Sequence, residues 1–64
     1  MAKRRTTRIL TFADAVNIQT LIIQGEMQHS IAALYGVNQG RISEINTEKR
    51  HRGSHTEALR RLFP

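Results

Sequence analysis

A glycine between two short apolar patterns restricts the fold of this chain more than any other feature. Apolar side chains recur at helical spacing on both sides of Gly36. They are Ile31, Ala32 and Tyr35 before it, and Val37, Ile42 and Ile45 after it. Glycine takes a positive φ without steric cost, so it can end one helix and begin a sharp turn. Ala32 is small enough for a second helix to pass over it. The pattern therefore predicts two helices that cross steeply at a short turn.

Capping signals predict a further helix before this pair. Thr11 and Asp14 have the spacing of a capping box, in which each side chain binds the other residue's backbone N–H. The helix is expected to run to about Gln24, and Gly25 suits its left-handed end. Its apolar residues form two adjoining stripes, Ala15, Ile18, Leu21 and Ile22 on one and Phe12, Val16 and Ile23 on the other. Stripes this wide indicate that the helix packs against two partners.

The remaining segments complete an all-α domain of four helices over residues 11–64, after a flexible basic arm over residues 1–10. Asn38 is a good N-cap for the third helix, and Ser54 with Glu57 forms a second capping box that opens the fourth. A charged linker over residues 48–53 joins these two helices. The expected bounds of the second, third and fourth helices are 26 or 27 to 35, 39 to 46 or 47, and 54 to 63. No segment alternates with a period of two, so no sheet is predicted.

Basic residues gather in clusters rather than being spread evenly. The chain of 64 residues has 10 Lys and Arg against 5 Asp and Glu, a formal net charge of +5. The clusters are Lys3, Arg4, Arg5 and Arg8; Lys49, Arg50 and Arg52, with His51 among them; and Arg60 with Arg61. Clustered positive charge indicates a polyanionic partner such as nucleic acid.

Several function classes are disfavoured. The chain has no cysteine, which excludes disulfides and thiolate zinc sites. His29, His51 and His55 have no carboxylate at ligand spacing, so no metal or other cofactor is expected, and no arrangement of serine, histidine and acid suggests an enzyme. A domain this small has a thin core, and self-association is the expected supplement. No apolar run has the length of a signal peptide or a membrane span, so a cytoplasmic, DNA-associated protein is expected.

The segment from Gln28 to Ile45 resembles the bacterial and phage helix-turn-helix family of DNA-binding regulators. A small residue four before the turn glycine, a branched apolar residue after it and two more on the second helix are the features that match; here they are Ala32, Gly36, Val37, Ile42 and Ile45. The resemblance covers about 20 of the 64 residues. It implies that the second helix of the pair lies in the DNA major groove and contacts base edges.

The base contacts implied by this resemblance lie on the face that points away from Ile42 and Ile45, which carries Gly40, Ser43, Glu44 and Thr47, and beside it at the start of the helix, where Gln39 and Arg41 flank that face. The candidates are Asn38, Gln39, Gly40, Arg41, Ser43, Glu44 and Thr47. Gln39 can bind adenine, and Arg41 can bind guanine or a phosphate. Glu44 either accepts from cytosine N4 or pairs with Arg41 and orients it. Gly40 either lets the backbone approach the groove closely or is a tolerated weak helix position.

Contacts to the DNA backbone are expected from the basic clusters and from the start of the second helix. These candidates are Lys3, Arg4, Arg5, Arg8, Gln28, Ser30, Lys49, Arg50 and Arg52. A homodimer on double-stranded DNA is expected, because one recognition helix seldom supplies enough base contacts. Leu59, Leu62 and Phe63 on the last helix are the candidate dimer interface.

These expectations favour a sequence-specific DNA-binding regulator, most simply a repressor of phage or mobile-element type that excludes polymerase from an operator. Three alternatives remain at this point. The first is an accessory DNA-binding protein of recombination or packaging, the second is an activator, and the third is a protein-interaction module such as an antitoxin. No small-molecule ligand is expected.

Overall fold

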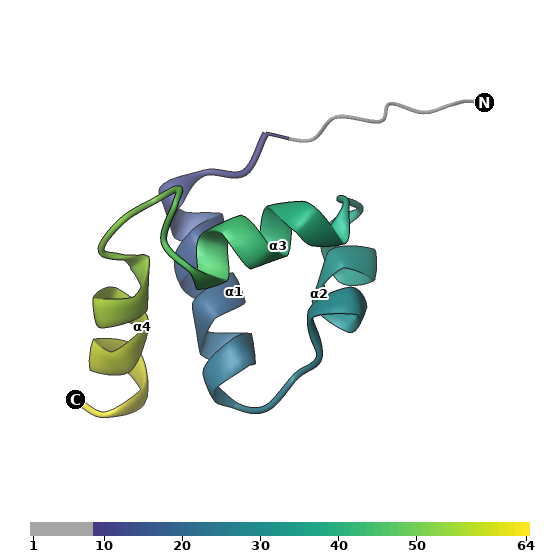
Figure 1. Cartoon of the computed structure of the whole chain (residues 1–64). Coiled ribbons are helices and arrows are strands. Elements are labelled where there is room, and N and C mark those ends of the chain that lie inside the picture. The colour runs from purple at the N-terminus through teal and green to yellow at the C-terminus, as the bar shows by residue number, and fades with distance from the viewer. Residues whose placement is uncertain (1–8) are drawn as a thin grey trace.

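The computed structural model describes residues 9–64, which contain four helices and no strand. The helices are α1 (Phe12–Ile23), α2 (Gln28–Tyr35), α3 (Gln39–Asn46) and α4 (Ser54–Leu62). Figure 1 shows α1 in the middle of the molecule, with α4 on one side of it, α2 on the other and α3 crossing it. The all-α, four-helix fold predicted from the sequence is confirmed.

Both ends of α1 are formed as the sequence predicts. Thr11 Oγ1 accepts from the Asp14 backbone N–H at 3.1 Å, and Asp14 Oδ2 accepts from the Thr11 N–H at 3.0 Å. Gly25 has a φ of +96°, and the chain leaves the helix there. α1 packs against α2, α3 and α4, one partner more than the two stripes predict.

The turn between α2 and α3 depends on Gly36, whose φ is +68°. The Val37 N–H donates to the Ala32 carbonyl at 3.0 Å, which closes the end of α2. Asn38 then caps α3, since its Oδ1 accepts from the Gly40 N–H at 2.6 Å. α2 begins at Gln28, slightly later than predicted, because Met27 still has an extended backbone.

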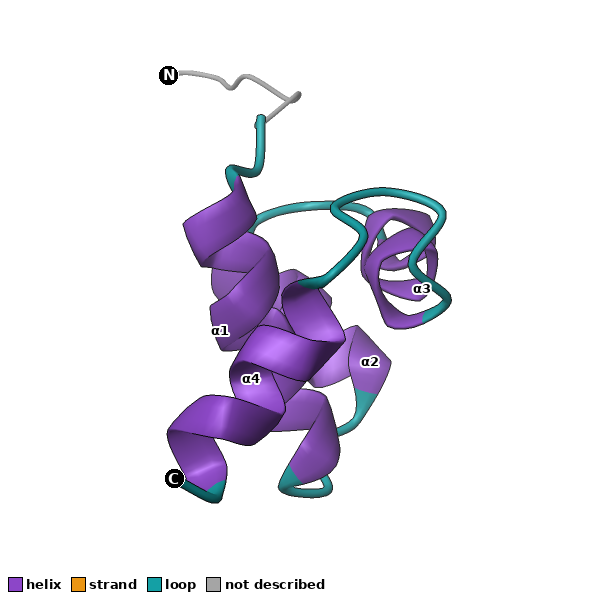
Figure 2. Ribbon diagram, turned by 90° about the vertical axis from the view of Figure 1, so that its left-hand side faces the viewer, coloured by secondary structure: helices purple, strands orange, loops and turns teal. Residues whose placement is uncertain are grey.

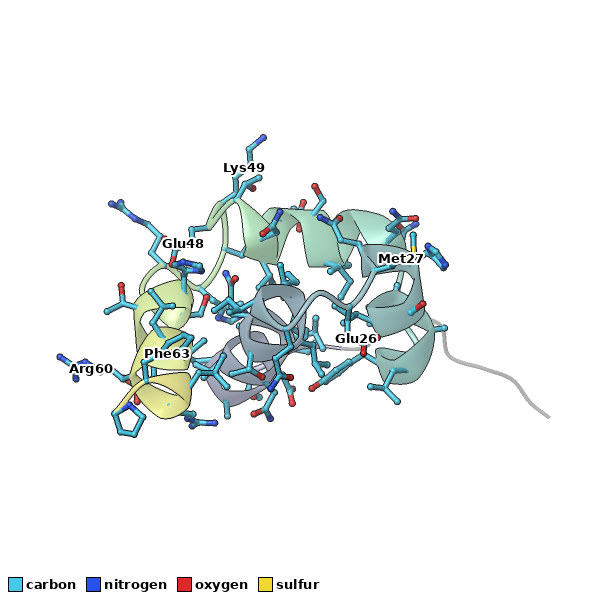
Figure 3. All side chains as sticks on the ribbon, turned by 90° about the horizontal axis from the view of Figure 1, so that it is seen from below. Glu26, Met27, Glu48, Lys49, Arg60 and Phe63 are labelled. Atoms are coloured by element: carbon cyan, nitrogen blue, oxygen red, sulfur yellow. The ribbon has the colours of Figure 1, made fainter. Side chains whose placement is uncertain are left out.

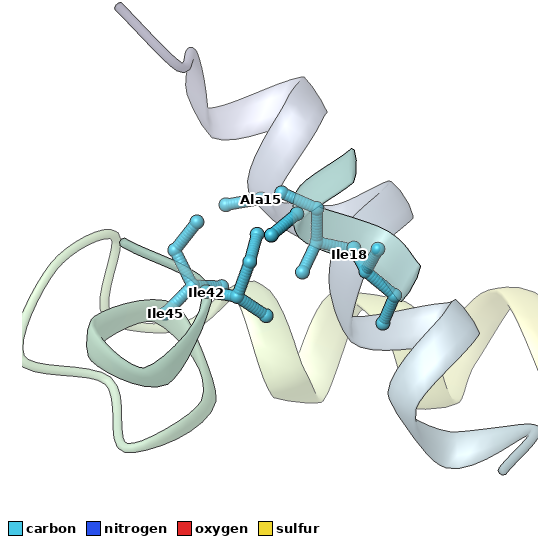
Figure 4. Packing of buried hydrophobic residues seen from close by; sticks show 6 residues of the cluster. Ala15, Ile18, Ile42 and Ile45 are labelled. Atoms are coloured by element: carbon cyan, nitrogen blue, oxygen red, sulfur yellow. The ribbon is translucent and has the colours of Figure 1, made fainter. Parts of the chain in front are cut away.

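The core lies where α1, α2 and α3 meet. Its buried apolar residues are Ala15, Ile18, Ile31, Ala32, Ile42 and Ile45, with Leu10, Leu21, Ile22, Tyr35 and Val37 packed around them. Figure 4 shows Ile42 and Ile45 of α3 facing Ala15 and Ile18 of α1. Burial of each isoleucine contributes about 1.5–3 kcal/mol. The predicted inward positions of α3 are therefore confirmed, and its opposite side stays free of the core.

The connection from α3 to α4 corrects the second predicted capping box. Ser54 does not cap α4. The N-cap is Gly53, which has no side chain that could accept a hydrogen bond. The carboxylate of Glu48 takes that role, accepting from the backbone N–H of Gly53 at 2.9 Å and of His55 at 3.2 Å. The reason is that Ser54 is fully buried and faces α1 instead of its own helix end.

A buried amide explains the position of Ser54. Gln19 of α1 is completely inaccessible to solvent. Its Nε2 donates to the Ile45 carbonyl at 2.6 Å and to Ser54 Oγ at 3.3 Å, while its Oε1 lies 3.4 Å from Nδ1 of His55. Gln19 thereby joins α1, the end of α3 and the start of α4. The sequence predicts no role for Gln19.

α4 lies alongside α1 and runs in the same general direction (Figure 2). Ala58 is fully buried at the contact, and Arg61 Nη1 donates to Asn17 Oδ1 of α1 at 3.2 Å. No helix within residues 9–64 is long and apolar enough to cross a membrane.

Candidate nucleic-acid interface

The outer side of α3 presents a row of polar side chains. With Ile42 and Ile45 buried, six of the seven predicted base-contacting residues are exposed and the seventh, Glu44, is half-buried. The exposed ones are Asn38, Gln39, Gly40, Arg41, Ser43 and Thr47. The core thus fixes which side of α3 a ligand can reach.

These side chains differ in how free they are to bind. Within residues 9–64, Gln39, Arg41 and Ser43 make no side-chain hydrogen bond or ion pair, so their polar groups are available to a ligand. Thr47 is partly committed, because its Oγ1 donates to the Ser43 carbonyl at 3.0 Å. Asn38 is committed through Oδ1 to the cap of α3.

Gly40 lies in the first turn of α3 beside that cap. A Cβ at this position would lie 3.1 Å from Asn38 Oδ1 and 4.0 Å from Asn38 Cγ, and beyond its own helix it would meet no other residue within 4 Å. This contact gives glycine a local structural reason, in addition to the two readings from sequence. The small residue also leaves the helix backbone open to close approach at this point.

Glu44 pairs with a different arginine from the one predicted. Its Oε1 accepts from Arg50 Nε at 3.1 Å, and it has no ion pair with Arg41. The turn after α3 explains this, because Glu48 adopts a φ of +58° and the following backbone folds back, so that the Lys49 N–H donates to the Glu44 carbonyl at 2.9 Å. The fold-back brings Arg50 beside the end of α3 and leaves Arg41 free.

A shallow recess lies beside this ion pair. Its walls are formed by the segment before α1, by α3 and by the turn after α3, through Ile9, Leu10, Arg41, Glu44, Ile45, Arg50 and His51. The apolar residues of this lining are Ile9, Leu10 and Ile45, and its charged residues are two arginines and one glutamate. His51 also makes an edge-on contact with Phe12, with ring centroids 6.3 Å apart, which holds the turn against the start of α1.

The predicted DNA-backbone residues lie on several elements. Lys49, Arg50 and Arg52 are exposed on the turn after α3, and Figure 3 shows Lys49 projecting away from the body of the molecule. Gln28 and Ser30 lie on the first turn of α2, where Ser30 is exposed and Gln28 half-buried. Four further candidates lie outside the described residues, namely Lys3, Arg4, Arg5 and Arg8.

One exposed polar residue of α3 is not among the residues predicted to contact bases. Asn46 is the last residue of α3 and is exposed. It follows Gln39 by seven residues, so both lie on the same stripe of the helix. That spacing was visible in the sequence, but asparagine was interpreted only as a helix-ending residue.

The predicted dimer residues on α4 divide into two groups. Leu62 is half-buried, whereas Leu59 and Phe63 are exposed to 37% and 70%. Leu59 lies on α4, whereas Phe63 follows the last residue of the helix, where its backbone N–H donates to the Leu59 carbonyl at 2.8 Å. Ala58, which the prediction did not include, makes the contact with α1 instead.

Within residues 9–64, no three histidine, cysteine or acidic side chains lie together in a way that could hold a metal ion. In comparisons with known proteins, no family model, curated protein or solved structure matches this chain. A function is therefore inferred from the residues of the chain itself.

Proposed function

We propose that the protein is a sequence-specific DNA-binding regulator that inserts α3 into the major groove of double-stranded DNA. One observation carries the proposal: α3 is anchored by Ile42 and Ile45 and exposes polar side chains away from them. A major groove about 12 Å wide admits a helix in this way. A short turn joins α2 to α3, and α2 packs against α3 and supports it.

The exposed side chains suit base recognition. Gln39 can form two hydrogen bonds with adenine, and Arg41 can form two with guanine, through the base edges that the major groove presents. Both side chains are free of other bonds in the described part of the chain, so neither must break one to bind. Asn46 adds a second amide on the Gln39 stripe.

The charge distribution supports a polyanionic partner. The chain has few acidic residues and a net charge of +5. Lys49 and Arg52 extend from the turn that follows α3. Phosphate contacts from such residues position a helix in the groove without reading its sequence. In this proposal the protein is cytoplasmic, acts as a repressor of phage or mobile-element type, and blocks polymerase by occupying an operator.

The direct test is binding of the full chain to a library of randomised DNA duplexes over a range of salt concentrations. A DNA-binding protein selects a preferred sequence, and its affinity falls with salt by a log–log slope of about −0.9 for each phosphate neutralised. Mapping the bound sites on the source genome then separates a repressor, with a site in a promoter, from an accessory protein with scattered sites. Affinity that selects no sequence and does not change with salt would exclude DNA as the partner.

A further inference from the structure

The pair of Glu44 and Arg50 sets two opposite charges on the face proposed to meet DNA. Arg50 Nε lies 3.1 Å from Glu44 Oε1, and the two side chains are 60% and 41% exposed. An ion pair this exposed adds little to stability, because water screens both charges. It therefore opens at low cost, and its effect on binding exceeds its effect on folding.

While the ion pair is closed, neither Glu44 nor Arg50 is available to bind DNA. Arg50 is neutralised, so it attracts phosphate weakly. If Arg50 moves to a phosphate, Glu44 is left as a bare carboxylate facing a polyanion, and juxtaposed like charges are strongly unfavourable. If a duplex offers a phosphate to Arg50 but no partner to Glu44, opening the ion pair adds little to the free energy of binding.

Cytosine supplies the missing partner for Glu44. Its N4 amino group is a hydrogen-bond donor in the major groove, which a carboxylate can accept. Glu44 lies one helical turn after Gly40, on the outward side of α3. Arg41, three residues before Glu44 on the same helix, has no ion pair within residues 9–64.

We propose that this ion pair opens by exchange: at a cytosine, Glu44 moves to the N4 amino group while Arg50 moves to a neighbouring phosphate. Glu44 is then a residue that determines specificity for a C·G pair, and Arg50 neutralises Glu44 on duplexes that offer it no cytosine. The inference rests on the proposed DNA-binding function and names how one base pair of the site is selected.

The test is selection from randomised duplexes with wild-type protein, Glu44→Gln and Glu57→Gln. Wild type is expected to enrich C·G at one position of each site. Glu44→Gln should lose roughly tenfold of the preference at that position alone, and should bind random-sequence duplex several-fold more tightly because Arg50 is released. Glu57→Gln removes the same charge from α4, where Glu57 lies 4.0 Å from Arg60, and should keep the preference.

Arg50→Gln completes the experiment. It should weaken binding to every duplex and retain the cytosine preference, because Glu44 still faces the base. If Glu44→Gln changes affinity equally for all sequences and no position loses its preference, the exchange is wrong while DNA binding stands. If wild type selects no sequence, the proposed function itself fails. Circular dichroism of each variant checks that helical content is unchanged.

Discussion

The backbone conformation of Glu48 destabilises the fold, whereas its side chain stabilises it. Its backbone is left-handed, with φ of +58°, which costs a residue with a Cβ about 1–2 kcal/mol. Its carboxylate accepts from two N–H groups at the start of α4, where a negative charge also complements the helix dipole. The side chain thus offsets strain that its own backbone creates.

Replacing Glu48 by alanine should lower the free energy of unfolding by about 1–2 kcal/mol, because the cap is lost and the strain stays. Glu48→Gly should cost less, since glycine removes the strain as well as the cap. Urea denaturation followed by circular dichroism measures both. Glu26→Ala, at an exposed acid outside this network, is the control and should change stability little. Equal losses for Ala and Gly would mean that the backbone at this position is not strained.

Gln19 is the second residue whose change is informative. Its amide is buried and serves Ile45, Ser54 and His55 together. Gln19→Leu has similar volume but leaves the buried hydroxyl and carbonyl without this donor, and it should cost about 1–3 kcal/mol. Thermal denaturation measures the loss, with Gln24→Leu at the exposed end of α1 as control. A Gln19→Leu protein as stable as wild type would show that the amide is dispensable.

At the scale of elements, α3 is the part of the molecule on which sequence recognition is proposed to depend. Gln39→Ala should weaken binding to the selected DNA site by about 1–3 kcal/mol and binding to random duplex much less. Asn46→Ala should act in the same direction if the stripe they share faces bases. Affinity measured by fluorescence anisotropy on both duplexes gives the comparison. Gln24→Ala on α1 should leave both affinities unchanged, and equal losses on both duplexes would make Gln39 a backbone contact.

The elements also show which features of sequence are sufficient for prediction. Gly25 and Gly36 were predicted as left-handed helix ends because glycine alone adopts that backbone without cost, and both have positive φ. The box of Thr11 and Asp14 was predictable because its partners are three residues apart. Local chemistry of this kind depends on few neighbours, so sequence alone carries it.

Where prediction failed, the partner came either from a distant part of the chain or from an unexpected turn. Ser54 has the spacing of a capping residue but binds Gln19, 35 positions earlier. Glu44 binds Arg50 rather than Arg41, because a non-glycine residue, Glu48, takes the left-handed turn that brings Arg50 back. Propensity gives no reason to expect glutamate there, so the first error follows from a tertiary contact and the second from the turn at Glu48.

At the scale of the whole molecule, the exposed pair of Leu59 and Phe63 is the surface on which a homodimer is predicted. Phe63→Glu should give a folded monomer that has lost most of its affinity for a site with two half-sites, since dimers of this class span about one helical turn of DNA. Phe63 is preferred to Leu62, which is half-buried and would disturb the fold. Analytical ultracentrifugation and DNA affinity are the measurements.

Leu34→Glu provides the matched control for this prediction. Leu34 is 72% exposed on α2, away from α4, and its replacement should leave the oligomeric state unchanged. If wild type stays monomeric at high concentration and occupies a single half-site, the dimer prediction is wrong. α4 would then serve only to cover α1.

The placement of the single tyrosine gives the core formed by α1, α2 and α3 an optical signal of its own. Tyr35 packs against the core formed by α1, α2 and α3, and the sequence contains no tryptophan. Intrinsic fluorescence therefore monitors that core and is blind to α4, whereas far-ultraviolet circular dichroism counts all the helices. Melting curves that coincide by the two methods would establish a single cooperative transition. Ellipticity lost before the emission changes would reveal that α4 detaches first and leaves the rest of the fold intact.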